Sequence, residues 1–154
     1  MILVALGSNQ PGPWGEPAAT IRHAIAQLDR HPLTLVSAST AIVTKPFGRT
    51  DQPDFVNAVA NITTALTPDK LLRHLQSIEA SAGRKRNLKW GPRTLDLDII
   101  DFNGMIRSGD ALHLPHPGIA ERHFVLQPIA EMAPHWRHPV NGLTAQQMLD
   151  ALPA

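Results

Sequence analysis

Two aspartates near the middle of the chain carry the clearest chemical signal in the sequence. Asp96 and Asp98 lie two residues apart in a stretch, 94–102, whose apolar and β-branched residues predict a strand. Successive side chains of a strand point to opposite faces, so both carboxylates project side by side. Carboxylate oxygens with no His or Cys close in sequence suit a hard divalent ion, and Mg²⁺ leaves its remaining positions to phosphate and water. The pair therefore predicts a Mg²⁺ site. The residues expected to face the core are Leu95, Leu97 and Ile99.

A generic Asp-x-Asp is more often the solvated outer face of an edge strand. Here Ile100 and Phe102 are expected to continue the aspartate face as apolar residues. A fully solvated face would stay polar, so the carboxylates are expected at the rim of a half-buried cleft.

The residues just before this strand are strongly basic. From Arg84 to Arg93 the chain has five cationic side chains and no acidic one. A solvated charge run is the alternative interpretation. Arginine, however, supplies the planar, bidentate donors that suit phosphate. Cations beside a paired-carboxylate metal site together indicate a polyphosphate site with Mg²⁺. The chain has no Gly-x-x-x-x-Gly-Lys-Ser/Thr and no Gly-x-Gly-x-x-Gly, so a nucleotide must be held without either phosphate-binding loop.

Strands and helices alternate along the chain and must position these groups. Thr67 as N-cap, Pro68 at the first helical position and Gly83 as the stop delimit the clearest helix. In the strand that begins at Phe55, Phe55 and Asn57 share a face. Such an alternation predicts an open α/β or α+β sandwich with helices packed on a sheet. The expected strands are 2–6, 33–38, 41–43, 55–62 and 94–102, and the expected helices surround 21–28, 68–82, 124–132 and 144–152.

Length and composition narrow the function classes. The 154 residues are expected to form a single domain, 1–154, with a substantial core. The net charge of +1 leaves no global field that would attract nucleic acid or an anionic membrane. The absence of cysteine excludes disulfides, thiolate metal sites and a cysteine nucleophile. The first apolar run is far shorter than the roughly 18 residues that span a bilayer, so we expect a soluble cytoplasmic protein.

The run from Trp90 to Ile99 resembles the signature of the 6-hydroxymethyl-7,8-dihydropterin pyrophosphokinases, which are enzymes of the folate pathway. Other segments agree with this family in order along the whole chain: Gly7-Ser8-Asn9, 51–57, Gln76 with Glu79, Gly83-Arg84, Pro115-His116, Arg122 and Phe124. The resemblance implies transfer of the β,γ-diphosphoryl group of ATP to the pterin hydroxymethyl oxygen, with release of AMP. It also implies a ferredoxin-like, mostly antiparallel fold with three mobile loops, which we expect to act as a monomer on small molecules.

The resemblance assigns roles to particular residues. Asp96 and Asp98 are implied as ligands of two Mg²⁺ ions, and Arg84 and Arg93 as the cations on the transferring phosphates. The implied ATP-binding residues are Gln76, Glu79, Arg84, Arg86, Trp90, Arg93, Ile99, His116 and Arg122. The implied pterin-binding residues are Thr44, Pro46, Phe47, Phe55, Asn57, Trp90, Asp96 and Phe124.

Two rings are implied to sandwich the flat pterin, Phe55 and Phe124, while Asn57 hydrogen-bonds its edge. The family often has tyrosine at the position of Phe55, and this chain has no tyrosine, so stacking is expected without a hydroxyl contact. The stretch from Arg84 to Trp90 is slightly short for the family. Its like charges and few apolar residues predict that the segment 84–89 becomes ordered only when ATP binds.

Two other functions remain possible from the residues alone. A ferredoxin-like RNA- or nucleotide-binding module would use the basic stretch but gives no reason for Asp96 and Asp98. A purely structural domain leaves the whole central stretch unexplained. The sequence offers no convincing general base, although Asp96 or Asp98 could relay a proton through a metal-bound water.

Overall fold

The computed structural model describes residues 1–45, 53–84 and 93–153. No helix in this part of the chain is long and apolar enough to cross a bilayer. The described elements follow in the order β1 (Ile2–Ser8), α1 (Pro17–Gln27), β2 (Leu33–Ala38), β3 (Ile42–Thr44), β4 (Phe55–Thr64), α2 (Pro68–Ser81), β5 (Asp96–Phe102), a short 3₁₀ helix (Ile119–Glu121), α3 (His123–Met132) and α4 (Ala145–Asp150).

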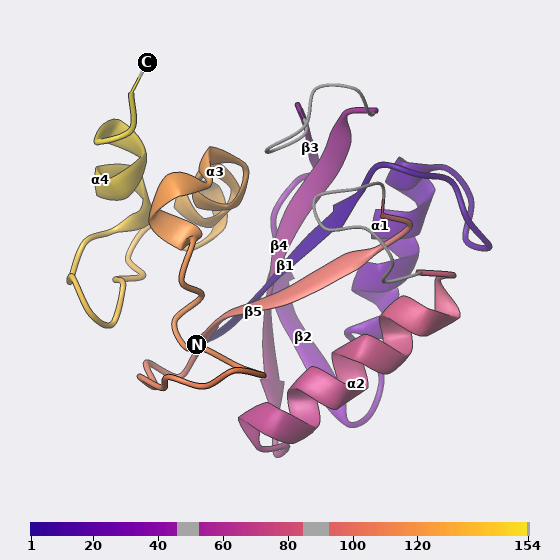
Figure 1. The fold of residues 1–154 in the computed structure, drawn as a ribbon, viewed down its shortest axis with the longest axis horizontal. Coiled ribbons are helices and arrows are strands. Elements are labelled where there is room, and N and C mark those ends of the chain that lie inside the picture. The colour runs from indigo at the N-terminus through magenta and orange to yellow at the C-terminus, as the bar shows by residue number, and fades with distance from the viewer. Residues whose placement is uncertain (46–52, 85–92, 154) are drawn as a thin grey trace.

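The strands form one antiparallel sheet in the order β2-β4-β1-β5, and β3 pairs with the beginning of β4. Each of the two outer connections, β1 to β2 and β4 to β5, passes through a helix, and both helices lie on the same side of the sheet (Figure 1). With the short β3 set aside, the remaining elements follow the order β-α-β-β-α-β, which is the ferredoxin-like arrangement. The prediction of an antiparallel α+β sandwich is confirmed.

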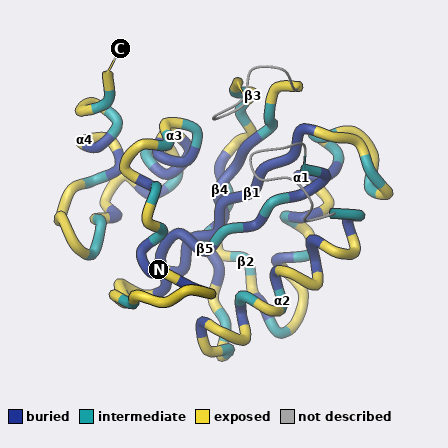
Figure 2. The backbone as a smooth tube through the Cα atoms, viewed as in Figure 1, coloured by how far each residue is buried: buried dark blue, intermediate teal, exposed yellow. Residues whose placement is uncertain are grey.

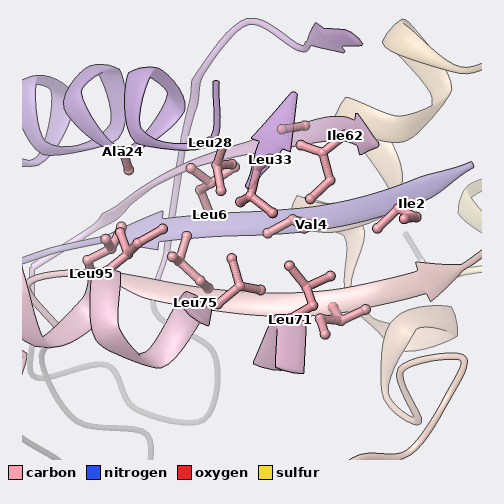
Figure 3. Close-up of a cluster of buried hydrophobic side chains, with 14 of the residues drawn as sticks. Ile2, Val4, Leu6, Ala24, Leu28, Leu33, Ile62, Leu71, Leu75 and Leu95 are labelled. Carbon is pink, nitrogen blue, oxygen red and sulfur yellow. The ribbon is translucent and has the colours of Figure 1, made fainter. Parts of the chain in front are cut away.

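The main core fills the space between the sheet and α1 and α2. Leu71, Leu75 and Ile78 form the apolar stripe of α2, and they pack against alternate residues of the strands. Figure 3 shows side chains of the strands and of both helices meeting in this layer. In Figure 2 the central strands are buried along most of their length, and exposed residues lie on the outer sides of the helices. The labelled residues of the cluster are Ile2, Val4, Leu6, Ala24, Leu28, Leu33, Ile62, Leu71, Leu75 and Leu95.

A second, smaller core lies on the opposite face of the sheet, where α3 and α4 pack (Figure 1). Leu3 and Val59 contribute to it from the centre of the sheet. Trp136 belongs to the same cluster, and its indole N–H donates to Oδ2 of the buried Asp101 at 2.7 Å. This bond connects the C-terminal segment to β5. The helices of the C-terminal segment therefore cover part of the face that an open ferredoxin-like sheet would expose.

The predicted ends of several elements are confirmed by local geometry. The hydroxyl oxygen of Thr67 accepts from the N–H of Lys70, and Pro68 opens α2. Gly83 follows the helix with a φ of +84°, a left-handed conformation that glycine adopts without strain. Thr144 and Gln147 form a reciprocal capping box at the start of α4.

One predicted position on β5 is wrong. Phe102 was expected on the aspartate face, but it packs in the main core beside α2. The reason is a bulge: Val4 pairs with Ile99 and Leu3 pairs with Asp101, so Ile100 is an extra residue. Ile100 keeps to the aspartate face, as expected, and the residues after it change sides.

Candidate active site

The uncovered end of the second sheet face forms the floor of a pocket of about 260 Å³. Alternate residues of three strands point to this face, and α3 covers only one end of it. The strands thus supply a polar floor, and α3 with the segment before it supplies one wall. The lining residues are Ala5, Leu6, Gly7, Thr44, Lys45, Phe55, Asn57, Arg84, Arg93, Asp96, Asp98, Ile100, His116, Arg122, Phe124 and Val125.

The two aspartates lie on this floor as predicted. Asp96 pairs with Gly7 and Asp98 with Ala5 across the β1–β5 ladder. Burial, and after it the charge of Asp96, raises the pKa of Asp98 to about 8, while Arg122 and Arg84 act in the opposite direction. Two carboxylates at this site therefore repel each other unless a cation or a proton is present.

Arg84 is held by carboxylates on two sides. Its Nη1 donates to Oδ1 of Asp96 at 2.7 Å and also to Oε2 of Glu79. Glu79 is 2% exposed, and the same oxygen accepts the N–H of Leu97 at 2.7 Å. The guanidinium is thereby fixed beside the aspartate pair. Of the segment 84–89, for which we predict ordering on ATP binding, only Arg84 is described, and it is ion-paired and nearly buried; residues 85–89 lie outside the described residues, so the prediction for this segment stays a prediction.

His116 presents an uncharged donor to the pocket. Burial, and after it the charge of Arg122, lowers the pKa of His116 to about 4, so the ring is neutral near pH 7. The N–H of Gly118 donates to Nδ1 at 3.1 Å, which leaves the ring proton on Nε2. The backbone N–H of His116 donates to the carbonyl of Ile100 at 2.9 Å, so the bulge of β5 fixes its position.

Two aromatic rings line the pocket, one from β4 and one from α3. Phe55 opens β4, and Phe124 is the second residue of α3. Both are half-buried and line the pocket. The guanidinium carbon of Arg122 lies 6.0 Å from the centre of the Phe124 ring, which places a cation at the edge of this wall. A flat heterocycle is the kind of ligand that such walls accept.

Asn57 supplies a buried amide to the same pocket. It is buried, and its Nδ2 donates to Oγ1 of Thr44. Gly7 lies directly beneath: a Cβ at this position would lie 3.1 Å from Oδ1 of Asn57 and 3.6 Å from the ring of Phe55. Glycine at position 7 therefore lets the amide and the ring approach β1.

The donor set of this site fits Mg²⁺ only in part. In the described ranges no group of three or more His, Cys, Asp or Glu side chains is arranged to hold a metal. Asp96 and Asp98 offer hard oxygen donors, and the raised pKa of Asp98 indicates a local need for positive charge. Mg²⁺ often binds through one or two carboxylates and completes its shell with substrate phosphate. The two residues therefore fit a metal that arrives with a polyphosphate.

Not all predicted site residues line the pocket. Gln76 is exposed on α2, Glu79 acts behind Arg84, and the side chain of Ile99 is buried in the main core. The structure brings together the predicted residues Thr44, Phe55, Asn57, Arg84, Arg93, Asp96, Asp98, His116, Arg122 and Phe124. The predicted residues Pro46, Phe47, Arg86 and Trp90 lie outside the described residues.

Sequence reasoning placed the backbone of residues 44–47 at the rim of the pterin site but gave the side chain of Lys45 no role. Lys45 lines the pocket together with Thr44 and adds a further cation to its lining. Its position at the end of a short strand, before a turn-rich stretch, is a weak signal that could have suggested a functional role.

The chain is similar in sequence to proteins of known name. The sequence model described as 7,8-dihydro-6-hydroxymethylpterin-pyrophosphokinase (HPPK) matches residues 3–134. A protein of Pseudomonas aeruginosa named 2-amino-4-hydroxy-6-hydroxymethyldihydropteridine pyrophosphokinase is 44% identical over 99% of this chain and 91% of its own length. A protein of the same name from Haemophilus influenzae is 45% identical over 84% of this chain and 79% of its own length. The folic acid synthesis protein fol1 of Schizosaccharomyces pombe is 36% identical over 98% of this chain, which covers 20% of that protein.

Proposed function

The chain belongs to the 7,8-dihydro-6-hydroxymethylpterin-pyrophosphokinase family, and we propose that the pocket between β4, β5 and α3 is where it works. The protein is a diphosphotransferase of folate biosynthesis that pyrophosphorylates 6-hydroxymethyl-7,8-dihydropterin. The donor in our proposal is ATP, and the products are AMP and the pterin diphosphate. One observation carries the assignment of the site: a single pocket is lined by a carboxylate pair, three arginines and two aromatic rings.

The acceptor alcohol is the nucleophile in this reaction. Its hydroxymethyl oxygen forms a bond to the β-phosphorus, the bond from that phosphorus to the α,β-bridging oxygen breaks, and AMP leaves with the bond's electron pair. The hydroxyl proton passes to water. The protein then needs no nucleophile of its own. It has to align the two substrates and to hold positive charge beside the phosphates.

Each wall of the pocket has a part in this proposal. Two Mg²⁺ ions bound with ATP would supply positive charge against the triphosphate, and Asp96 and Asp98 would hold them. Arg93 neutralises charge on the transferring phosphates. The neutral ring of His116 donates from Nε2 to a phosphate oxygen, and Arg122 adds charge at the same wall.

The aromatic part of the pocket accepts the pterin in this proposal. The rings of Phe55 and Phe124 stack on its two faces, and Asn57 with Thr44 contacts its polar edge. Since both substrate regions are lined by residues of one chain, we also propose that a monomer is sufficient for activity.

The direct test is to mix the protein with ATP, Mg²⁺ and the pterin alcohol and to identify the products. AMP and the pterin diphosphate are expected in equal amounts. ADP with a pterin monophosphate would replace this proposal by ordinary phosphoryl transfer. Turnover without added pterin would identify hydrolysis of ATP instead.

Replacing Phe124 by Ala is expected to weaken pterin binding by roughly 1–3 kcal/mol, because a stacked, half-buried ring is lost. Binding of ATP should stay nearly unchanged. Calorimetric titrations with each substrate measure both effects. Phe124→Leu is the matched control, because it retains apolar volume without a ring and should recover only part of the loss. A parallel loss of ATP affinity would show that Phe124 supports the fold rather than the pterin.

Replacing Arg93 by Ala is expected to lower kcat by roughly 10²- to 10³-fold while KM for ATP changes far less, because the charge it meets develops mainly during transfer. Steady-state kinetics with both substrates varied measure this split. Arg93→Lys retains the charge but not the planar pair of donors, so it should recover part of kcat. A variant with normal kcat and a raised KM would place Arg93 in ground-state ATP binding.

A further inference from the structure

Asn9 is a buried amide with bonds to two separate segments of the chain. It follows β1 and is 1% exposed. Its Oδ1 accepts the backbone N–H of Arg93 at 2.7 Å, and its Nδ2 donates to the carbonyl of Pro53 at 3.0 Å. The backbone N–H of Asn9 also donates to the carbonyl of Arg93 at 3.0 Å. Arg93 is thus bonded to Asn9 through both of its main-chain polar groups.

The two segments carry opposite sides of the pocket. Arg93 lies before β5 and belongs to the part of the pocket that we propose binds phosphate, the phosphate side. Pro53 lies two residues before Phe55, one of the two rings proposed to bind the pterin, on the acceptor side. A single carboxamide spans both. Leucine has a similar shape but cannot form either bond, and aspartate offers acceptors only.

The two bonds depend on each other. An amide can rotate so that oxygen and nitrogen exchange places, and only one orientation puts the oxygen opposite the N–H of Arg93. The bond from Nδ2 to Pro53 selects that orientation. Because Asn9 is buried, loss of its side chain would also leave the N–H of Arg93 without this acceptor.

We propose that Asn9 is a positioning residue for the transfer reaction, which holds the main chain of Arg93 in register with the acceptor side of the pocket. This inference rests on the proposed function, since it assigns Asn9 an effect on Arg93 as a group that acts on the transferring phosphates. Asn9 itself touches no substrate in this account. Its contribution is to keep the guanidinium where charge develops.

The first test compares Asn9→Leu with a matched loss of a buried hydrogen bond elsewhere. Ser39→Ala is the control, because the buried Oγ of Ser39 accepts the N–H of Val59 at 2.9 Å and contacts neither segment. Both variants are expected to lower Tm by roughly 5 °C. Asn9→Leu should also lower kcat by about 10- to 100-fold, the usual effect of a supporting group, with KM within about threefold. Ser39→Ala should retain kcat, and an equal fall in both would overturn the proposal.

The second test is a double-mutant cycle with Arg93→Ala. If Asn9 acts through the Arg93 guanidinium, adding Asn9→Leu to Arg93→Ala should change kcat by less than about twofold. Independent effects that multiply in the double variant would contradict the proposal. Asn9→Asp retains an acceptor for the Arg93 N–H and should recover part of the kcat that Asn9→Leu loses.

A third measurement needs no catalysis. Amide hydrogen exchange at Arg93 should be at least about tenfold faster in Asn9→Leu than in the wild type, whereas Ser39→Ala should leave it unchanged. Unchanged protection of the Arg93 amide in Asn9→Leu would overturn the proposal. Absence of AMP formation by the wild-type protein would instead overturn the proposed function, so the two failures can be told apart.

Discussion

Replacing Asp98 by Asn is expected to lower kcat by roughly 10²- to 10³-fold or more and, at the same time, to make the unliganded protein more stable. The loss of activity follows if Asp98 holds one of the Mg²⁺ ions that neutralise the triphosphate, because an amide is a much weaker ligand than a carboxylate. Product assays at saturating ATP, Mg²⁺ and pterin measure the loss.

The gain in stability follows from the electrostatics of the empty pocket. Burial and the charge of Asp96 raise the pKa of Asp98 from 3.8 to about 8. The unfolded chain releases this proton near pH 4, so the folded state loses stability as the pH rises from about 4 to 8. Asp98→Asn has no such proton to lose. Its free energy of unfolding should exceed that of the wild type by roughly 1–4 kcal/mol at pH 8 and by little at pH 4.

Chemical denaturation in the presence of a chelator, at several pH values, measures this difference. Asp110→Asn is a suitable control, because Asp110 is exposed and does not line the pocket, and it should change neither kcat nor stability. Full activity of Asp98→Asn would refute the metal-binding role. A variant less stable than the wild type at pH 8 would show that the carboxylate is stabilised by its surroundings.

The floor of the pocket could be predicted because it depends on local patterns. The alternation in β4 places Phe55 and Asn57 on one face, and the spacing of Asp96 and Asp98 places both on one face of β5. An antiparallel, ferredoxin-like order then brings these faces together. The periodicity of α2, its N-cap and its terminal glycine likewise arise from residues close in sequence.

The supports of the site could not be predicted, because they depend on contacts between distant residues. Asn9 and Arg93 are 84 positions apart, and no periodicity indicates that one accepts a bond from the other. The bulge that moves Phe102 into the main core is visible only in the pairing with β1. Similarly, the sequence marks Arg84 as a phosphate-binding cation, whereas its pairing with Glu79 requires the folded end of α2. Pairings of this kind decide how rigidly the site is held.

Replacing Glu79 by Leu is expected to destabilise the protein by roughly 3–5 kcal/mol, because the nearly buried Arg84 loses one of its two carboxylate partners and a buried backbone N–H loses its acceptor. The carboxylate of Glu79 pairs with Arg84 and accepts the N–H of Leu97, so the variant leaves both groups without this acceptor. For a chain of this length the change corresponds to a fall in Tm of about 10 °C. Thermal unfolding followed by circular dichroism measures it.

The same variants separate a supporting role of Glu79 from direct contact with ATP. Glu79→Gln retains an acceptor for the N–H of Leu97 and loses only the charge that faces Arg84, so its fall in Tm should be clearly smaller than that of Glu79→Leu. A residue that contacted only ATP would show the opposite behaviour: both variants would raise KM for ATP and leave Tm unchanged. Glu79 is 2% exposed and accepts a hydrogen bond from the backbone of β5. We therefore expect Tm to be highest for the wild type, lower for Glu79→Gln and lowest for Glu79→Leu. If kcat falls in either variant, we expect the cause to be that Arg84 is no longer held in its position beside Asp96.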